Sequence, residues 1–327
     1  MTGEARNVLV TGGTGFVGSH VVDALLEAGY RVRCLVRVKS RLRWLEGKPV
    51  ELVQADLRDG ELAGAVAGVD TVIHCAGLTR GSRRALFATN YEGTRSLLDA
   101  CVASGRRLQF LYCSSQAAAG PGALQRPREV DDAPAPTGDY GRSKLAAEQE
   151  VLERRDQLDV VVLRPVSVYG PRDEDTLPLV RMATHGVIVV PGLRRRLMQL
   201  VHVRDVAEAL RKAAERRQAV GNTYFVAHPT TIDWRQLSAA LGQAVGRRLV
   251  SLRLPSPLLW PVGAAAELLG GSRRAGRLDL RRARDLSQRA WTCRVDRTME
   301  DLEWEPRYDI VEGVRDTAAW YREEGWL

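Results

Sequence analysis

Short apolar, β-branched runs alternate with longer helical patterns over the first two thirds of the chain, and this alternation constrains the fold more than any other feature. Parallel strands need a crossover helix between them, which such an alternation supplies. The sequence therefore predicts an α/β fold built on a doubly wound parallel sheet. The expected strands lie near Asn7 to Thr11, Arg31 to Arg37, Val50 to Gln54, Thr71 to Cys75, Gln109 to Ser114 and Val160 to Val168. The expected helices lie near Gly15 to Ala28, Tyr91 to Ser104 and Tyr140 to Arg155.

The pattern changes after Pro229, where helices alternate with only short strands. Before that point a helix at Asp205 to Arg217 and a strand at Thr223 to Ala227 continue the earlier pattern, so this strand is expected to rejoin the sheet. We predict a first domain over 1–171 that is rejoined by about 198–228. A smaller, discontinuous C-terminal substrate-binding domain would comprise 172–197 and 229–327, with elements at Asp233 to Val245, Val250 to Leu254, Pro257 to Leu269 and Val311 to Glu324.

Charge and composition limit the partners of the chain. Lys plus Arg number 48 against 40 Asp plus Glu, a net charge of +8, yet only four of the basic residues are lysines. The arginines form short clusters, such as Arg194 to Arg196, without interleaved aromatic residues or a groove-reading motif. We therefore expect a solvated basic face and no nucleic-acid partner. The 45% hydrophobic content is that of a soluble globular protein.

Cysteine usage and the start of the chain indicate a soluble, cytoplasmic protein. The five cysteines are odd in number, and none has a spacing to cysteine or histidine that suggests a metal site. We interpret them as reduced core residues and expect no metal. The chain enters an apolar run at Val8 without the long apolar stretch of a signal peptide, and no apolar run approaches the roughly 20 residues that span a bilayer.

A glycine-rich loop, Thr11-Gly12-Gly13-Thr14-Gly15-Phe16-Val17-Gly18, follows the first predicted strand and opens the first helix. Its glycines stand where a tight turn, a close approach to a pyrophosphate and close helix packing require them. The amides at the amino end of the helix attract phosphate. A flexible turn is the alternative, which the strand, loop and helix context disfavours. We therefore predict a Rossmann-type dinucleotide site that includes Gly12, Thr14, Gly15, Phe16 and Val17.

The second strand ends in Leu35-Val36-Arg37, without the carboxylate that would hold the ribose hydroxyls of NAD. Arg37 could instead pair with the 2′-phosphate of NADP, assisted by Ser40 or Arg41. A surface arginine beside a loop is the alternative. On this basis NADP(H) is favoured, and NAD(H) remains the alternative cofactor.

Two further segments border the predicted cofactor site. Asp56 and Leu57 follow the third strand, where they would reach the adenine, although Asp56 could instead cap a helix. The run His74-Cys75-Ala76-Gly77 ends the fourth strand, where its backbone would pass the cofactor. We interpret His74 as packed scaffolding and assign to the cofactor the three residues that follow it, Cys75, Ala76 and Gly77.

Tyr140 and Lys144 lie four residues apart, hence on one face of a predicted helix. Among the eight tyrosines only Tyr140 has a lysine at this spacing, and the chain uses arginine almost everywhere else. Because a free phenol titrates near about pH 10, proton transfer near neutrality asks for a lower pKa, at a cost of roughly 4 kcal/mol. An ammonium group and an oxidised nicotinamide can favour the phenolate. We predict that Tyr140 is the acid/base, that Lys144 tunes it, and that both touch the cofactor.

Ser115 closes the fifth predicted strand, at the carboxyl edge where α/β folds bind ligands. Its hydroxyl could hold the substrate oxygen while Tyr140 gives or takes the proton. Ser114 is the nearest rival for this role. Asn90, which precedes the helix from Tyr91, could cap that helix or point an amide into the pocket.

Together these motifs resemble the extended short-chain dehydrogenases/reductases, the group that includes NAD-dependent epimerase/dehydratases and 3β-hydroxysteroid dehydrogenase-like enzymes. The resemblance covers nearly the whole chain, including the runs Leu163 to Pro171 and Val201 to Val206. It implies an NAD(P)-dependent enzyme, and relatives of this kind form homodimers. The implied pyrophosphate contacts are Gly12, Gly15 and Gly18, and the implied catalytic triad is Ser115, Tyr140 and Lys144. Pro165 and Val168 would lie near the nicotinamide, and we assign to the substrate pocket Thr79, Ser115, Gln116 and Tyr169.

The sequence departs from two subgroups of this family. Dehydratases usually place Asp-Glu after the catalytic serine or threonine, where this chain has Gln116-Ala117. Nucleotide-sugar epimerases commonly end that segment with Val-Tyr-Gly, where this chain has Ala118-Ala119-Gly120. The apolar segment 254–269 resembles that of 3β-hydroxysteroid dehydrogenase-like reductases and suggests a hydrophobic substrate. A buried helix, or contact with a membrane surface beside Arg273 and Arg274, are the alternatives for this segment.

The resemblance thus implies hydride transfer between nicotinamide C4 and a hydroxyl or ketone of a hydrophobic small molecule. The alternative is a nucleotide-sugar epimerase that retains NAD. A dinucleotide-sensing scaffold without catalysis is a third hypothesis, which the intact set of Ser115, Tyr140 and Lys144 disfavours.

Overall fold

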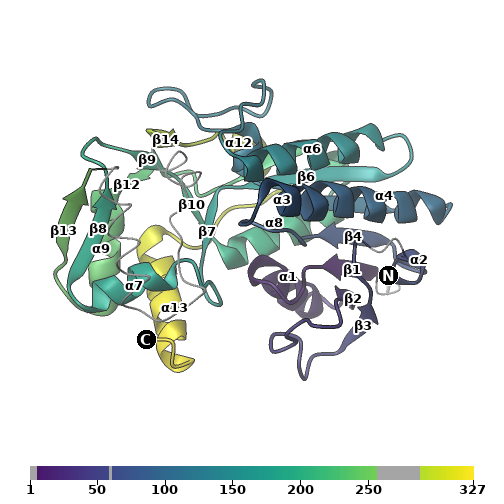
Figure 1. The fold of residues 1–327 in the computed structure, drawn as a ribbon, viewed down its shortest axis with the longest axis horizontal. Helices are drawn as coiled ribbons and strands as arrows, with labels where there is room; N and C mark the ends of the chain where they lie inside the picture. Colours follow the sequence, from purple (N-terminus) through teal and green to yellow (C-terminus); the bar gives the residue numbers. More distant parts are fainter. Residues whose placement is uncertain (1–5, 59–60, 256–287) are drawn as a thin grey trace.

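The computed structural model describes residues 6–58, 61–255 and 288–327. Its centre is a sheet of seven parallel strands, which confirms the predicted α/β class (Figure 1). The strand order reverses between β1 and β4, and open α/β sheets bind ligands at the carboxyl edge beside such a reversal. In the order in which they lie side by side, the strands are β11 (Thr223–Val226), β6 (Asp159–Pro165), β5 (Gln109–Cys113), β4 (Thr71–His74), β1 (Asn7–Thr11), β2 (Arg31–Val36) and β3 (Val50–Gln54).

Helices cover both faces of this sheet (Figure 1). On one face α1 (Phe16–Glu27) packs against α8 (Val203–Glu215). On the other face lie α4 (Gly93–Ala103) and α6 (Asp139–Glu153). We call the sheet and its helices the sheet region. Its shorter segments are α2 (Ala63–Val66), α3 (Arg83–Phe87), the π-helical η1 (Ala88–Glu92), α5 (Gln116–Ala119), the 3₁₀-helical η2 (Arg217–Ala219) and α12 (Asp296–Asp301).

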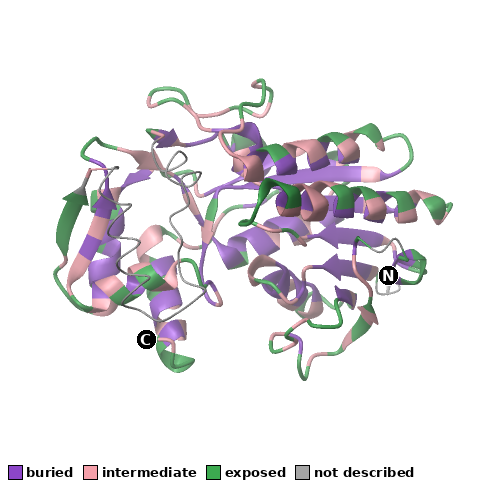
Figure 2. Cartoon of the chain, viewed as in Figure 1, coloured by how far each residue is buried: buried purple, intermediate pink, exposed green. Residues whose placement is uncertain are grey.

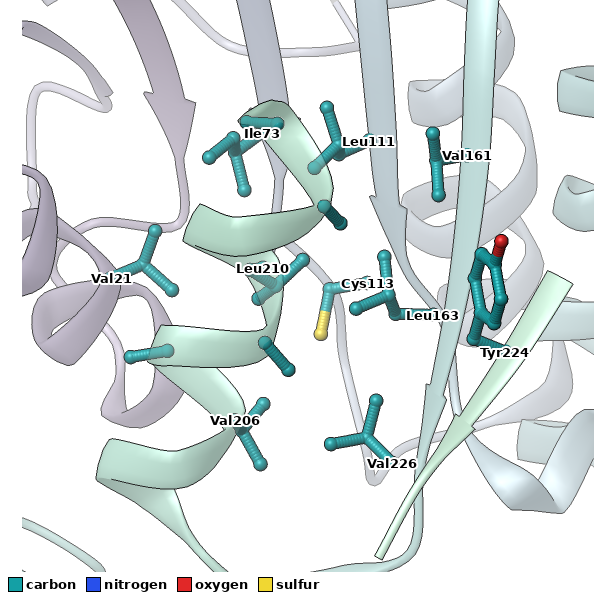
Figure 3. Close-up of a cluster of buried hydrophobic side chains, with 14 of the residues drawn as sticks. Val21, Ile73, Leu111, Cys113, Val161, Leu163, Val206, Leu210, Tyr224 and Val226 are labelled. Atoms are coloured by element: carbon teal, nitrogen blue, oxygen red, sulfur yellow. The ribbon is translucent and has the colours of Figure 1, made fainter. Parts of the chain in front are cut away.

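Continuous apolar runs bury the inner strands of the sheet on both faces. In β6 all four residues from Val160 to Leu163 are fully buried, as is typical of a parallel strand covered by helices on both sides. Figure 3 shows Val21 of α1 and Leu210 of α8 meeting Leu111 of β5 across one face. In Figure 2 the inner strands of the main sheet are buried, whereas the edge strand β3 and the outer surfaces of the helices are largely exposed. Because each buried Val or Leu stabilises by roughly 1.5–3 kcal/mol, this core holds the strand ends in fixed positions.

A second region lies beside the sheet and, among the described residues, contains three small sheets (Figure 1). Three helices enclose a core of its own, which includes Leu237, Val314 and Tyr321. The helices are α7 (Leu177–Thr184), α9 (Trp234–Val245) and α13 (Ile310–Glu323). The paired strands are β7 (Ser167–Tyr169) with β10 (Leu200–His202), β9 (Leu197–Met198) with β12 (Ile232–Asp233) and β14 (Ala290–Trp291), and β8 (Val187–Pro191) with β13 (Val250–Leu254).

The structure confirms the main predicted elements and changes two of them. The strand Thr223–Val226 does rejoin the main sheet, beside β6. The predicted strand from Val160 to Val168 is wrong as one element, because the chain leaves the main sheet after Pro165 and pairs with β10 instead. The predicted helix from Tyr91 begins earlier, at Arg83, and passes through η1. The predicted helix from Pro257 to Leu269 lies outside the described residues.

Contacts at the boundary join the two regions, and we call three of them the junction contacts. Each links α1 or a loop after a sheet strand to the second region. They are the hydrogen bond of His20 Nε2 to the Pro171 carbonyl oxygen (2.9 Å), the ring contact of Trp44 with Trp320 (5.7 Å between centroids), and the ion pair of Arg80 with Asp175.

Candidate active site

The glycine-rich loop lies at the carboxyl end of β1, against the segment that follows β4. Gly12 has a φ of +73°, and a Cβ added to it would lie 2.7 Å from the Ala76 amide nitrogen. A Cβ on Gly18 would lie 2.2 Å from the Gly12 carbonyl oxygen. Both positions therefore require glycine. The first turn of α1 follows with no acidic residue, so its free amides are available to a phosphate.

His74 holds the strand beneath this loop. Its Nδ1 lies 2.5 Å from the Thr11 hydroxyl and its Nε2 lies 2.9 Å from the Thr94 hydroxyl, so the ring links β1 to α4. The side chain is fully buried, and burial lowers the pKa of His74 to about 3. A neutral, doubly bonded ring in this position confirms the interpretation of His74 as scaffolding.

The three predicted catalytic residues converge at the carboxyl edge of the sheet. Tyr140, in the first turn of α6, forms a side-chain hydrogen bond with Ser115, which follows β5. Ser115 is the N-cap of α5, and its hydroxyl accepts from the Ala117 amide at 3.1 Å. The buried Lys144 ammonium donates to the Cys113 carbonyl oxygen at 2.7 Å, one turn along α6 from Tyr140. The geometry thus places a phenol, a hydroxyl and an ammonium around one point.

Two opposing influences set the pKa of Tyr140. Burial raises the pKa above the usual value for tyrosine, while the Lys144 charge and the Ser115 hydrogen bond lower it. Burial is the larger influence, so the phenol is protonated near neutral pH and stands ready to donate. These side chains alone therefore do not produce the lowered pKa of Tyr140 that we expected from the sequence.

The structure separates the two rival serines. The Ser114 hydroxyl donates to a carboxylate oxygen of Glu148, which is buried. Only Ser115 bonds to Tyr140. The Ser114 side chain therefore points to the buried Glu148, and the Ser115 hydroxyl is the one that faces the Tyr140 phenol.

Asn90 has a role that neither sequence hypothesis captured. The helix begins before it, so the predicted N-cap is wrong, and the side chain is buried within η1. Its amide oxygen accepts from the Leu78 amide at 2.7 Å. Its amide nitrogen donates to the Leu78 carbonyl oxygen and to the Ser143 hydroxyl, both at 2.9 Å. Asn90 thus fixes the segment after β4 against α6, beside Lys144.

The predicted adenosine end of the site is open on the Arg37 side. Arg37 and Arg41 are exposed, and neither forms an ion pair with any residue that the structure describes. Ser40 accepts from the Arg37 backbone amide at 3.0 Å, so it shapes this turn. Asp56 instead binds Arg58, which lowers the pKa of Asp56 to about 2.

Neighbouring residues at this end serve the fold. The predicted N-cap at Asp56 is wrong, because α2 starts at Ala63 with Leu62 at its N-cap. The Leu57 side chain is buried in the core below α4, where it packs against Gly93. An adenine contact from Leu57 would have to come from its backbone.

The predicted substrate residues fall into two groups. Gln116 directly follows Ser115, is 3% exposed, and its Nε2 has no hydrogen-bond partner among the residues that the structure describes. Thr79 is exposed in the loop after β4. Tyr169, by contrast, packs against α13 and its hydroxyl lies 3.4 Å from the Asp309 carbonyl oxygen, so this geometry gives it a packing role. Of the residues predicted near the nicotinamide, Pro165 ends β6 and Val168 pairs with Val201 beyond it.

Two general properties of the described residues bear on the site. Within residues 6–58, 61–255 and 288–327, no cluster of three or more His, Cys, Asp or Glu side chains could hold a metal ion. In the same ranges, no helix combines the length and the apolar character needed to cross a membrane.

Comparison with known proteins agrees with this geometry. Residues 8–227 match the model of the NAD dependent epimerase/dehydratase family. A putative dihydroflavonol 4-reductase of Synechocystis is 32% identical over 97% of this chain and 95% of its own length. A ceramide reductase of Caulobacter vibrioides is 28% identical over 100% of this chain and 98% of its own. The solved structure of MoeE5 in complex with UDP-glucose and NAD is 25% identical, with a TM-score of 0.79, over 97% of this chain and 99% of its own.

The family match covers well over half of the chain, and the dihydroflavonol reductase relative is similar over almost all of it. Members of this family use a nicotinamide dinucleotide. A fold of this kind binds the dinucleotide at the glycine-rich loop and the carboxyl edge of the sheet. The chain is an NAD(P)-dependent enzyme of the NAD-dependent epimerase/dehydratase family, within the extended short-chain dehydrogenases/reductases.

Proposed function

We propose that this enzyme moves a hydride between nicotinamide C4 and a hydroxyl or ketone carbon of a hydrophobic small molecule. The observation that carries the proposal is the hydrogen bond of Tyr140 with Ser115 beside the buried Lys144 ammonium. This arrangement can hold a carbonyl oxygen and protonate it. A dinucleotide fits the residues present, because the glycine cradle approaches Ala76 closely and the first amides of α1 are free.

Each of the three side chains has a distinct task in the reduction. When bound, the nicotinamide supplies the hydride. Ser115 donates a hydrogen bond to the substrate oxygen and orients it. Tyr140 donates its proton to the same oxygen, and the Lys144 ammonium stabilises the phenolate that remains. In the oxidation direction Tyr140 accepts the proton back.

We propose NADP(H) as the preferred cofactor. Arg37 supports this, since it is exposed at the end of β2 and forms no ion pair with a described residue. The nearby carboxylate of Asp56 is bound to Arg58. An exposed guanidinium at this edge suits a 2′-phosphate.

The proposal of a hydrophobic substrate rests on similar proteins. Two relatives that align over almost their whole length are named as reductases, one of them of ceramide. The Gln116 amide beside Ser115 has no partner among the described residues and adds one polar contact, to a second oxygen of such a substrate. A buried polar group without a partner is costly, so a ligand atom that satisfies it gains affinity.

A nucleotide-sugar epimerase that retains NAD is the second candidate. It is favoured by the likeness to MoeE5, a structure that holds UDP-glucose and NAD. The two candidates differ in what the purified enzyme carries. An epimerase keeps its dinucleotide through the reaction, whereas a reductase exchanges it in every turnover. Denaturing the pure protein and identifying any released dinucleotide separates them.

The Tyr140→Phe variant tests the proposed chemistry. We expect kcat for ketone reduction to fall by about 10²- to 10⁴-fold, because the proton donor is lost while the ring remains. NADPH affinity, measured by fluorescence titration, should stay at the wild-type value. Tyr30→Phe is the matched control, since the Tyr30 hydroxyl binds Glu215 away from the site. Wild-type turnover in Tyr140→Phe would refute the mechanism.

A further inference from the structure

Directly beneath the site lies a buried group of three polar side chains, Ser114, Glu148 and Arg164. Arg164 binds the Glu148 carboxylate with two of its three guanidinium nitrogens: Nε lies 3.0 Å from Oε1, and Nη2 lies 2.7 Å from Oε2. The Ser114 hydroxyl donates to Oε1 of the same carboxylate. Glu148 is 1% exposed and the other two side chains are 5% exposed. We call these three residues the buried polar network.

Each member of the network is next to a residue of the proposed active site. Ser114 precedes Ser115 at the end of β5. Arg164 precedes Pro165 at the end of β6. Glu148 lies one turn beyond Lys144 on α6, in the same stripe as Tyr140. One carboxylate therefore ties α6, which carries Tyr140 and Lys144, to the end of β5 beside Ser115 and to the end of β6.

Stability alone does not explain this arrangement. Removing two charges from water is expensive, and apolar side chains of similar volume are often as stabilising as a buried ion pair. The Nη1 atom of Arg164 is also buried, without a hydrogen-bond partner in the described part of the chain, which adds to the cost. Around the network α6 meets the sheet through apolar side chains such as Ala147 and Val151. Apolar contacts are not directional and allow a helix to slide or rotate, whereas hydrogen bonds to a carboxylate fix its position.

We propose that the buried polar network is a positioning device that sets the rotation and height of α6, so that Lys144 and Ser115 stay within reach of the Tyr140 hydroxyl. This inference rests on the proposed function. It assigns to Glu148 and Arg164 no contact with substrate or cofactor. Their effect reaches the chemistry only through the residues that they hold in place.

The groups that face Tyr140 predict how its titration responds. Lys144 on α6 and Ser115 at the start of α5 favour the phenolate, while Tyr112 and Cys113 on β5 oppose it. If α6 moves relative to β5, the two favourable groups separate from the hydroxyl. The pKa of Tyr140 should then rise above its value in the unaltered enzyme.

The main test is the double variant Glu148→Met/Arg164→Met, which removes both charges and keeps the side-chain volume. We expect kcat to fall by about 100-fold with KM and NADPH affinity unchanged, because a displacement of the proton donor affects only the chemical step. The carbon-13 resonance of the Tyr140 ring carbon that bears the hydroxyl should titrate at higher pH. This resonance is assigned by its absence in Tyr140→Phe.

The matched control is Glu150→Gln/Arg154→Gln. This pair lies on the same helix, at 2.7 Å, and faces Asp99 on α4 instead of the strands. We expect its kcat and its Tyr140 titration to equal those of the wild type. Should the double methionine variant fail to fold, Ser114→Ala removes one hydroxyl and leaves the ion pair. A kcat reduced by up to about tenfold at unchanged KM is then the expected result.

The outcomes separate this inference from the proposed function. A folded double variant with wild-type kcat and an unchanged Tyr140 titration overturns the positioning role, and wild-type kcat in Ser114→Ala does so if the double variant does not fold. If the wild-type enzyme reduces no ketone, the proposed function fails, and the Tyr140 resonance alone decides the inference because it needs neither substrate nor cofactor.

Discussion

The two regions of the molecule hold their functional parts in different ways. In the sheet region the polar contacts behind the catalytic groups are buried, with Glu148 only 1% exposed. Where the second region meets the sheet, the Arg80 and Asp175 side chains that form one junction contact are 41% and 47% exposed. Water and salt weaken the exposed Arg80–Asp175 ion pair, and they hardly reach the buried contacts around Glu148. The proposed proton-transfer groups are therefore tied to the stability of the fold, whereas this exposed junction contact can change at little cost.

The same contrast appears in the architecture. The sheet region has seven strands and helices on both faces, whereas the described part of the second region has sheets of two or three short strands. Two-stranded sheets are marginal alone and depend on helices that cover them. In the second region Tyr321 of α13 supplies such cover and donates its hydroxyl to the Asp173 carbonyl oxygen. Changes in the second region can thus arise without disturbing the proposed proton-transfer groups.

The largest expected effect compares a buried ion pair with an exposed one. Glu148→Gln should lower the free energy of unfolding by roughly 3–5 kcal/mol, because Arg164 is left as an unpaired buried charge. Arg80→Met breaks an exposed junction contact and should lower it by only about 0–1 kcal/mol. Urea unfolding of both variants measures the difference. Equal losses would break the comparison between the regions.

The next effect concerns the open end of the proposed cofactor site. Arg37→Ala should weaken NADPH binding by about 10- to 150-fold, since a hydrogen-bonded charge pair contributes roughly 1.5–3 kcal/mol. NADH binding should not change. Arg217→Ala is the control, because Arg217 is also exposed but lies in η2, before the strand at the opposite edge of the sheet. An equal loss of NADPH and NADH affinity in Arg37→Ala would argue against a 2′-phosphate contact.

A pH effect should arise at the junction itself. Burial and the Arg172 charge lower the pKa of His20 to about 4, and the neutral ring donates to the Pro171 carbonyl oxygen. Because the pKa in the folded state lies below the unfolded value near about 6.5, the stabilisation is present above that pH and is lost as the pH falls toward 4. Between pH 7 and pH 5 the expected loss is about 2 kcal/mol.

His20→Gln should remove this part of the pH dependence, because the amide can donate but does not titrate. Urea unfolding at both pH values, compared with the wild type, gives the difference directly. His185→Gln, at an exposed position, should leave the pH dependence as it is. A wild-type slope in His20→Gln would show that the junction does not respond to pH through this ring.

The sequence predicted the sheet region well and the second region in part: α9, β13 and α13 lie where they were expected, whereas the shortest strands were not predicted. Long apolar runs such as that of β6 and the strand, glycine loop and helix order are strong local signals. The strands β9, β12 and β14 have two residues each, which is too short for any periodicity. Their existence depends on partners distant in the chain.

Within the site, local patterns could not decide between neighbours. Ser114 and Ser115 both end the same strand, and only the carboxylate below one of them separates their roles. An acidic residue on a helix, such as Glu148, predicts a solvated side chain until its buried partner is known. Asn90 suggested a cap because helix patterns are weakest at their starts, and a π-helical segment gives no sequence signal of its own.

The smallest effect tests whether the aromatic junction contact couples the regions. The Trp44 and Trp320 rings meet at 5.7 Å and an angle of 55°, with Arg43 and Arg172 stacked on Trp44. A double-mutant cycle of Trp44→Ala and Trp320→Ala should give a coupling energy of about 1 kcal/mol in urea unfolding. A cycle between Trp44 and the distant Tyr224 on β11 should give none. This contact joins the loop after β2 to α13. A coupling energy well above that value would mean that the two regions unfold together as one unit. The two regions would then differ in how exposed their contacts are, and not in how firmly they are connected.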